Sequence, residues 1–151
     1  ARTLTAMDGF AGRIPGAMGT TMFCGVLDTR TGRLVYSNAG HPPGIFVHPD
    51  GRTELLEGGG DLPLGVLPEL PRSTTTCALC PGGTVLLYTD GLIERRHRSL
   101  DAGIRQIAAV VREGRTAPPE ELAQRLMAVM RPDGGFEDDV ALLLYRRPAA
   151  R

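Results

Sequence analysis

The chain has 151 residues, of which 42% are apolar and 23% charged, and its 17 basic and 17 acidic side chains give a formal net charge of zero. This length corresponds to one domain of ordinary size that can bury a core without covalent cross-links. The neutral balance, the scattered arginines and the few aromatic residues argue against a nucleic-acid partner, and no apolar run approaches the roughly 18 residues of a membrane span.

The first 19 residues predict a loop-like, mobile start, because they combine four glycines with Pro15. They also contain the earliest Asp-Gly pair, Asp8-Gly9, with no strand-like sequence before it. Asp-Gly pairs are common in turns, so we interpret this one as a turn.

The next segments have the composition or the alternation of strands, separated by turn signals rich in Gly, Pro and Asp. A loop rich in Pro and Gly, "DLPLGVLPELP", interrupts them at residues 61–71. The expected strands lie within residues 21–28, 33–40, 44–51, 52–60, 73–79 and 83–91.

The hydrophobic period then changes to that of helices. Residues 99–114 form an apolar stripe between a candidate N-cap, Ser99, and a stop at Gly114, and residues 118–130 form a second stripe. A last strand within 139–147 is apolar on both faces, which predicts a central or well-covered position. The order of elements predicts an α+β fold with mostly antiparallel sheets.

Three cysteines, Cys24, Cys77 and Cys80, form an odd set that includes one C-x-x-C pair. A zinc site would need two more soft ligands, and a redox pair would need a strand-to-helix setting. We interpret all three as plain buried thiols, which suits a reducing cytoplasm.

Acidic residues lie at the ends of two strong strands. Asp90 ends "LLYTD" and precedes Gly91, whereas Asp138 and Asp139 come directly before "VALLLY". If these strands are antiparallel neighbours, the carboxylates lie close together, where they repel one another unless a cation joins them. Such oxygen ligands suit Mg²⁺ or Mn²⁺, although each motif alone is more typical of a turn.

The motif "YSNAGHPP", residues 36–43, forms a polar corner after a strand. His41 is open to three interpretations, as a metal ligand, a general acid or a solvated loop histidine, and a single histidine favours the last.

Four motifs in this order, "NAGHPP", "LPLGV", "LLYTDGLIE" and "DDVALLL", resemble the bacterial metal-dependent Ser/Thr phosphatases of the protein phosphatase 2C superfamily. The subgroup is that of stage II sporulation protein E and the sigma-factor regulators of the stress response. The resemblance implies an α-β-β-α sandwich, a Mn²⁺ or Mg²⁺ centre, and hydrolysis of a phosphoserine by metal-activated water. The implied substrate is a phosphorylated anti-sigma-factor antagonist.

By this resemblance Asp90 and Asp138 match metal ligands, Asp139 stands beside the second ligand, and Glu94 matches an accessory acidic position. His41 falls where eukaryotic relatives carry an aspartate. Nothing before Thr21 matches the family's metal-bridging aspartate, so we expect residues 1–151 to be the C-terminal two-thirds of one phosphatase domain.

Two other interpretations stay open. The chain is a non-catalytic regulatory module that keeps the phosphatase scaffold to bind a partner, or it is a plain metal-binding or structural fold whose acidic loop ends are turns. The sequence does not set the oligomeric state.

Overall fold

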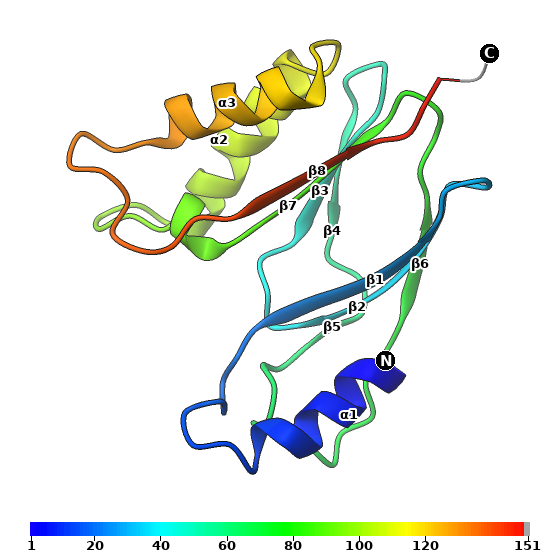
Figure 1. The fold of residues 1–151 in the computed structure, drawn as a ribbon, viewed down its shortest axis with the longest axis vertical. Coiled ribbons are helices and arrows are strands. Elements are labelled where there is room, and N and C mark those ends of the chain that lie inside the picture. Colours follow the sequence, from blue (N-terminus) through cyan, green and yellow to red (C-terminus); the bar gives the residue numbers. More distant parts are fainter. Residues whose placement is uncertain (150–151) are drawn as a thin grey trace. The chain divides into compact units, whose positions relative to one another are not determined.

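The computed structural model describes residues 1–149 of the chain and divides into two compact units. The first unit comprises Ala1–Pro43 and Glu57–Ala78, and the second comprises Gly44–Leu56 and the chain from Leu79 onward. Each unit contains one sheet, and Figure 1 labels the elements.

The sheet of the first unit is built around β2, which pairs antiparallel with β1 along its whole length and with β6. A two-residue strand, β5, adds a short parallel pairing at the end of β2. The strands are β1 (Met22–Asp28), β2 (Arg33–Ala39), β5 (Gly60–Asp61) and β6 (Thr75–Ala78).

The first unit also contains a helix, α1 (Arg2–Ala11), so the predicted loop-like start is wrong for these residues. Its buried face carries Leu4, Asp8 and Ala11, which are spaced at i, i+4 and i+7. Leu4 and Ala11 pack with Ala39 and Leu64 in a small core. Two features hid this helix in the sequence. Glycines suggested a loop, and Asp8 interrupts the apolar stripe with a charged residue.

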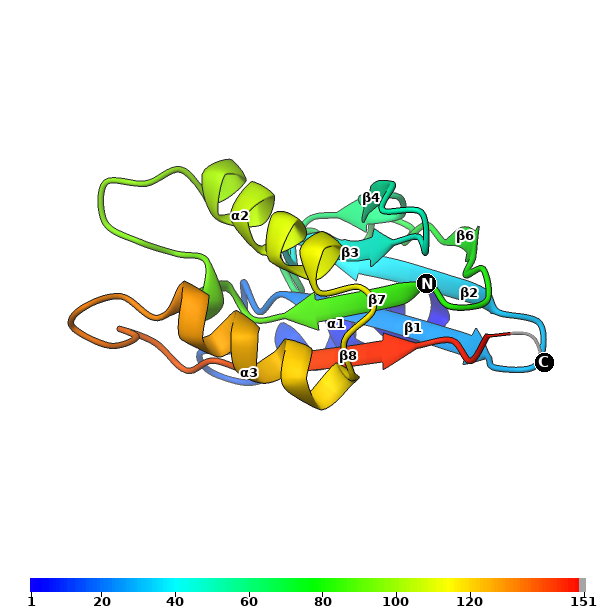
Figure 2. The same ribbon diagram turned by 90° about the horizontal axis from the view of Figure 1, so that it is seen from above.

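The sheet of the second unit has the order β4-β3-β7-β8, and all of its pairings are antiparallel. Helices α2 and α3 lie against it, as Figures 1 and 2 show. The elements are β3 (Gly44–Val47), β4 (Thr53–Leu56), β7 (Thr84–Tyr88), the 3₁₀ turn η1 (Asp90–Leu92), α2 (Leu100–Glu113), α3 (Pro119–Met130) and β8 (Leu142–Arg146).

Both predicted helices of this unit are confirmed with their signals. The Ser99 side chain accepts a hydrogen bond from the backbone N–H of Ala102, and Gly114 follows the last turn of α2. Pro119 opens α3, where its missing N–H costs nothing. The helices bury their stripes against β3 and β7, and the fully buried side chains include Ile45, Leu86, Ile107, Leu122 and Leu126.

The predicted central position of the last strand is wrong, because β8 is an edge strand of its sheet in the described chain. Leu143 is 57% exposed, whereas its neighbours on the strand are half-buried. Apolar side chains on both faces of a strand therefore did not indicate two covered faces here.

The longest described helix, α2, has 14 residues, and none of the helices within residues 1–149 has the length and hydropathy to cross a bilayer.

Candidate metal site

The end of β7 and the start of β8 lie side by side, which is the condition for Asp90 and Asp138 to lie close together. The register pairs Tyr88 with Leu142, and the pairing continues one step beyond the strands. The Thr89 N–H donates to the Ala141 carbonyl at 3.0 Å, and the Ala141 N–H donates to the Thr89 hydroxyl at 2.9 Å. The segments that carry Asp90 and Asp138 therefore meet at one end of the second unit.

Gly91 allows this close approach. A Cβ at position 91 would lie 2.6 Å from the backbone oxygen of Asp139 and 3.3 Å from the carbonyl carbon of Asp138. No side chain fits at such distances without a backbone shift. The Asp-Gly sequence after β7 is thus explained by packing against the 138–139 peptide, and the chain turns there into η1.

The two carboxylates use their oxygens in the same way. Oδ1 of Asp90 accepts from the N–H of Gly91 at 3.0 Å, and Oδ1 of Asp138 accepts from the N–H of Asp139 at 2.7 Å. Within residues 1–149, neither carboxylate forms an ion pair, and neither Oδ2 accepts a hydrogen bond. Two acidic groups without a cationic partner offer oxygen ligands to a hard divalent ion.

A cavity of about 310 Å³ opens beside these residues. Its lining combines three acidic side chains, two arginines and one glycine: Gly91, Glu94, Arg95, Arg96, Glu137 and Asp138.

The two arginines in this lining differ in function. The Arg95 guanidinium is hydrogen-bonded to the backbone. It donates to the carbonyls of Gly91, Leu92, Glu94 and Met130. Arg96 is 80% exposed and pairs loosely with Glu137, at 3.3 Å. Arg95 therefore holds the loop after η1 in place, and Arg96 leaves its charge at the cavity mouth.

Two further predicted acidic residues reach the same end of the unit. Glu94 is exposed and lines the cavity, and its backbone N–H donates to the Asp90 carbonyl at 2.8 Å. Asp139 is exposed, and its carbonyl accepts from the Thr89 hydroxyl at 3.1 Å. Asp139 thus contributes through its backbone to the junction of β7 and β8.

The donor set fits one divalent ion rather than two. No group of three or more His, Cys, Asp or Glu side chains gathers in a metal-binding arrangement within residues 1–149. Two carboxylates leave the remaining positions of an octahedral Mg²⁺ or Mn²⁺ to water, which Mg²⁺ sites commonly retain.

His41 belongs to the first unit, in the corner that follows β2. The Asn38 side chain closes this corner, because its oxygen accepts from the His41 N–H and its amide donates to the His41 carbonyl, both at 2.8 Å. The Nδ1 of His41 lies 2.8 Å from the Pro42 carbonyl, so it carries the proton and donates. These contacts agree with a structural loop histidine.

The first unit contains a buried ion pair that the sequence did not predict. The Asp8 side chain is 1% exposed and accepts from the Arg72 guanidinium at 2.6 and 2.8 Å, and from the Gly65 N–H at 3.0 Å. The Arg72 hydrogen bond holds the pKa of Asp8 below its usual value. Asp8-Gly9 is therefore neither a turn nor a loop.

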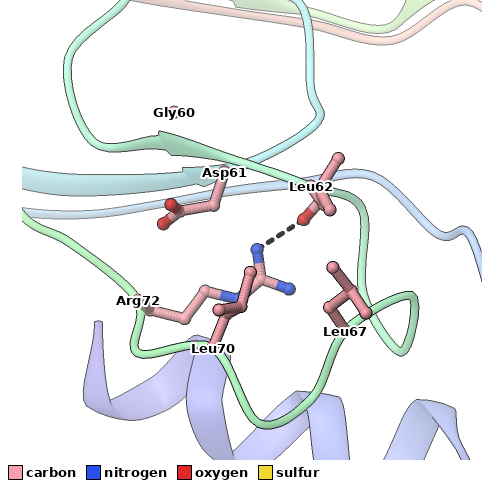
Figure 3. Close-up of a pocket in the computed structure, with 6 residues that line it drawn as sticks. All are labelled: Gly60, Asp61, Leu62, Leu67, Leu70 and Arg72. Carbon is pink, nitrogen blue, oxygen red and sulfur yellow. Dashed lines mark hydrogen bonds between the residues drawn. The ribbon is translucent and has the colours of Figure 1, made fainter.

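Arg72 contributes to a second cavity, of about 350 Å³, that Figure 3 shows in close-up. Its guanidinium also donates to the Leu62 carbonyl, beside Leu67 and Leu70. A signal for the pair was present in the sequence, because a charged residue at the centre of a helical stripe requires a partner. Nothing local identified Arg72, which follows 64 residues later.

A family model described as "Stage II sporulation protein E (SpoIIE)" matches residues 1–148. The chain belongs to the SpoIIE family. This family is one of phosphatases that resemble protein phosphatase 2C, so the predicted family and fold class are confirmed.

The chain is similar to three proteins of known activity or structure. The chain is 32% identical over 68 residues to the phosphoserine phosphatase RsbP of Bacillus subtilis, which covers 45% of this chain and 17% of RsbP. A crystal structure of the RsbU and RsbW domains of Rv1364c from Mycobacterium tuberculosis is 34% identical, with a TM-score of 0.87 over 99% of this chain and 42% of that one.

The manganese-presoaked phosphatase domain of SpoIIE from Bacillus subtilis shares the fold at 16% identity, with a TM-score of 0.73 over 99% of this chain and 66% of that chain. The SpoIIE-family chain thus spans less than two thirds of the length of each of these proteins.

Proposed function

We propose that this SpoIIE-family chain carries part of a metal-dependent protein serine/threonine phosphatase centre, with Asp90 and Asp138 as ligands of one Mn²⁺ or Mg²⁺ ion. The observation that supports the proposal most is that the segments carrying Asp90 and Asp138 meet at one end of the β7–β8 pair, where neither carboxylate forms an ion pair among the described residues.

Each residue of the proposed metal site has a distinct role. Asp90 and Asp138 hold the ion through carboxylate oxygens that no described hydrogen bond occupies. A bound ion supplies Lewis acidity toward a phosphoryl group and toward water. Gly91 keeps the two ligand segments in contact, and Glu94 adds a carboxylate at the cavity edge.

The substrate class follows from the relatives. RsbP is a phosphoserine phosphatase by name, and the exposed Arg96 guanidinium at the cavity, which pairs with Glu137 at 3.3 Å, is a group that can bind a phosphate. We propose a phosphorylated regulatory protein as substrate, such as an anti-sigma-factor antagonist, acting in the cytoplasm.

A second candidate is a non-catalytic module that uses the phosphatase scaffold to bind a protein. It is favoured by the ligand arrangement, because no three His, Cys, Asp or Glu side chains within residues 1–149 are placed to hold a metal ion together. A clamp of two metal ions on a phosphate would need more.

Titration with Mn²⁺ separates these candidates. We expect saturable binding of one ion by calorimetry, weakened at least about tenfold, or roughly 1.4 kcal/mol, in Asp90→Asn and in Asp138→Asn. Asp133→Asn, at an exposed aspartate of the same loop, is the matched control and should bind as the parent does. Equal affinity in all four proteins would refute the assigned ligands.

Hydrolysis of a phosphoserine peptide in the presence of Mn²⁺ is the second measurement. Activity that chelation with EDTA removes and Mn²⁺ restores supports the enzyme. Ion binding with no hydrolysis by the folded chain supports the binding module instead, and no ion binding at all returns Asp90 and Asp138 to a role as turn residues.

A further inference from the structure

A cysteine, a histidine and a glutamate lie in line at the far end of the second unit's sheet. His48 and Glu54 belong to the β3–β4 hairpin, and Cys80 lies in the turn that leads into β7. The Cys80 Sγ is 3.5 Å from Nδ1 of His48, and Nε2 of the same ring is 2.8 Å from Oε1 of Glu54.

The hydrogen bonds fix the tautomer of His48. The Arg52 guanidinium lies 3.1 Å from Nδ1, and a guanidinium only donates, so Nδ1 carries a lone pair and Nε2 carries the proton. Nε2 therefore donates to Glu54. The single lone pair of Nδ1 faces both Arg52 and Cys80, so it accepts the proton of the Cys80 thiol once the Arg52 side chain, which is 61% exposed, moves away. This is the order of an activated nucleophile: a thiol, a base beside it, and a carboxylate that orients the base.

Packing holds this arrangement in place. His48 is 12% exposed and its ring lies 4.3 Å from that of Phe46, centroid to centroid. The His48 N–H donates to the Arg52 carbonyl at 2.8 Å, which closes the hairpin. Cys80 itself is half-buried, as Cys24 and Cys77 are, so exposure alone does not distinguish the three thiols.

Three arginines lie near the Cys80 turn and the β3–β4 hairpin. Arg115 donates to the Pro49 carbonyl of the hairpin at 3.1 Å, and Arg147 donates to the Leu79 carbonyl, next to Cys80, at 2.6 Å. Arg52 also lies in the hairpin, but its guanidinium is paired with the Glu54 carboxylate. Arg115 and Arg147 are therefore the cationic groups that favour the approach of an anionic reagent.

We propose that Cys80 is a nucleophilic modification site that undergoes thiol–disulfide exchange with an anionic low-molecular-weight disulfide. His48 Nδ1 takes the Sγ proton, and the sulfur attacks one sulfur atom of the disulfide. The S–S bond breaks as the new Sγ–S bond forms, and the departing thiolate takes the proton from His48. Cys80 is oxidised, the departing half is reduced, and the total charge is unchanged.

The site is separate from the acidic end of the sheet. Asp90 lies six positions after Thr84, the first residue of β7, which is about 20 Å at the rise of a strand. The proposal therefore does not depend on metal binding or phosphatase activity.

The test uses dithiobis-nitrobenzoate, an anionic aromatic disulfide, with the modified cysteines identified by peptide mass mapping. We expect Cys80 to react at least about tenfold faster than Cys24 and Cys77, since a positioned base contributes on this scale or more. His48→Gln should bring Cys80 to the rate of the other two, and Glu54→Gln should slow it in the same direction.

His97→Gln is the matched control, because it makes the same change at an exposed histidine of the same unit and should leave the Cys80 rate unaltered. If His48→Gln fails to fold, Glu54→Gln, at a side chain that is 41% exposed, still tests the relay. Equal rates for the three cysteines, or an unchanged Cys80 rate in a folded His48→Gln or Glu54→Gln variant, would overturn the proposal.

Discussion

Two of the four Asp-Gly dipeptides in the chain lie in contrasting environments, Asp8-Gly9 in the first unit and Asp90-Gly91 in the second. Asp8 is buried and neutralised by Arg72, and its glycine has nothing within 4 Å of a Cβ position. Asp90 is half-buried without an ion pair in the described chain, and its glycine touches the backbone of Asp139.

At both sites the role of the aspartate depends on a residue that is distant from it in the sequence. A guanidinium 64 residues away makes Asp8 a structural anchor of α1. The segment paired with the end of β7 brings Asp138 near Asp90, and neither of these carboxylates forms an ion pair within residues 1–149. In the same way, the glycine is dispensable at the first site and required by close packing at the second.

Breaking the first pair should produce the largest change. Asp8→Asn leaves Arg72 buried without its counter-ion, and we expect the free energy of unfolding to fall by about 3–5 kcal/mol. Denaturant titration of the whole chain measures this loss. The double variant Asp8→Leu with Arg72→Met should recover much of the stability, because it removes both charges. An Asp8→Asn chain as stable as the parent would show that the buried pair contributes nothing.

Acid should also weaken the Asp8–Arg72 pair. We expect it to lower the free energy of unfolding by less than the Asp8→Asn substitution does. The hydrogen bond from Arg72 depresses the pKa of Asp8 in the folded state. The contribution of Asp8 to the free energy of unfolding is therefore complete above the ordinary carboxyl pKa of about 3.9. It is lost as the pH falls through the lower pKa of the folded state. Unfolding curves between pH 6 and about pH 2 should decline more steeply for the parent than for Asp8→Asn, and parallel declines would contradict this assignment.

The glycines give the sharpest matched test. Gly91→Ala places a Cβ 2.6 Å from the Asp139 backbone oxygen, so we expect a loss of about 1–3 kcal/mol together with weaker Mn²⁺ binding. Gly9→Ala meets no atom and lies within α1, so it should stabilise the chain by up to about 1 kcal/mol. Thermal unfolding of both variants checks the opposite signs, and the same sign in both would remove the contrast between the two sites.

Much of the second unit was readable from the sequence because its signals are local. Ser99, Gly114 and Pro119 mark helix ends, and the apolar run before Asp90 predicts the strand β7. The meeting of Asp90 with Asp138 required only this one pairing.

The features that could not be predicted from the sequence depend on contacts between residues that are far apart in the chain. Helix α1 was missed because Arg72 is what makes a charged residue acceptable at the centre of its buried stripe. The edge position of β8 depends on how many strands the sheet has, which the composition of β8 does not encode. The Cys80–His48–Glu54 alignment arises from a hairpin and a turn that only the folded sheet brings together.

The long separation of Asp8 and Arg72 has a kinetic consequence. The intervening chain includes β1 and β2, so the ion pair closes a long loop, whose entropic cost is repaid only once that sheet exists. We therefore expect α1 to dock late on the folding pathway, so that loss of the pair speeds unfolding and leaves the folding rate nearly unchanged.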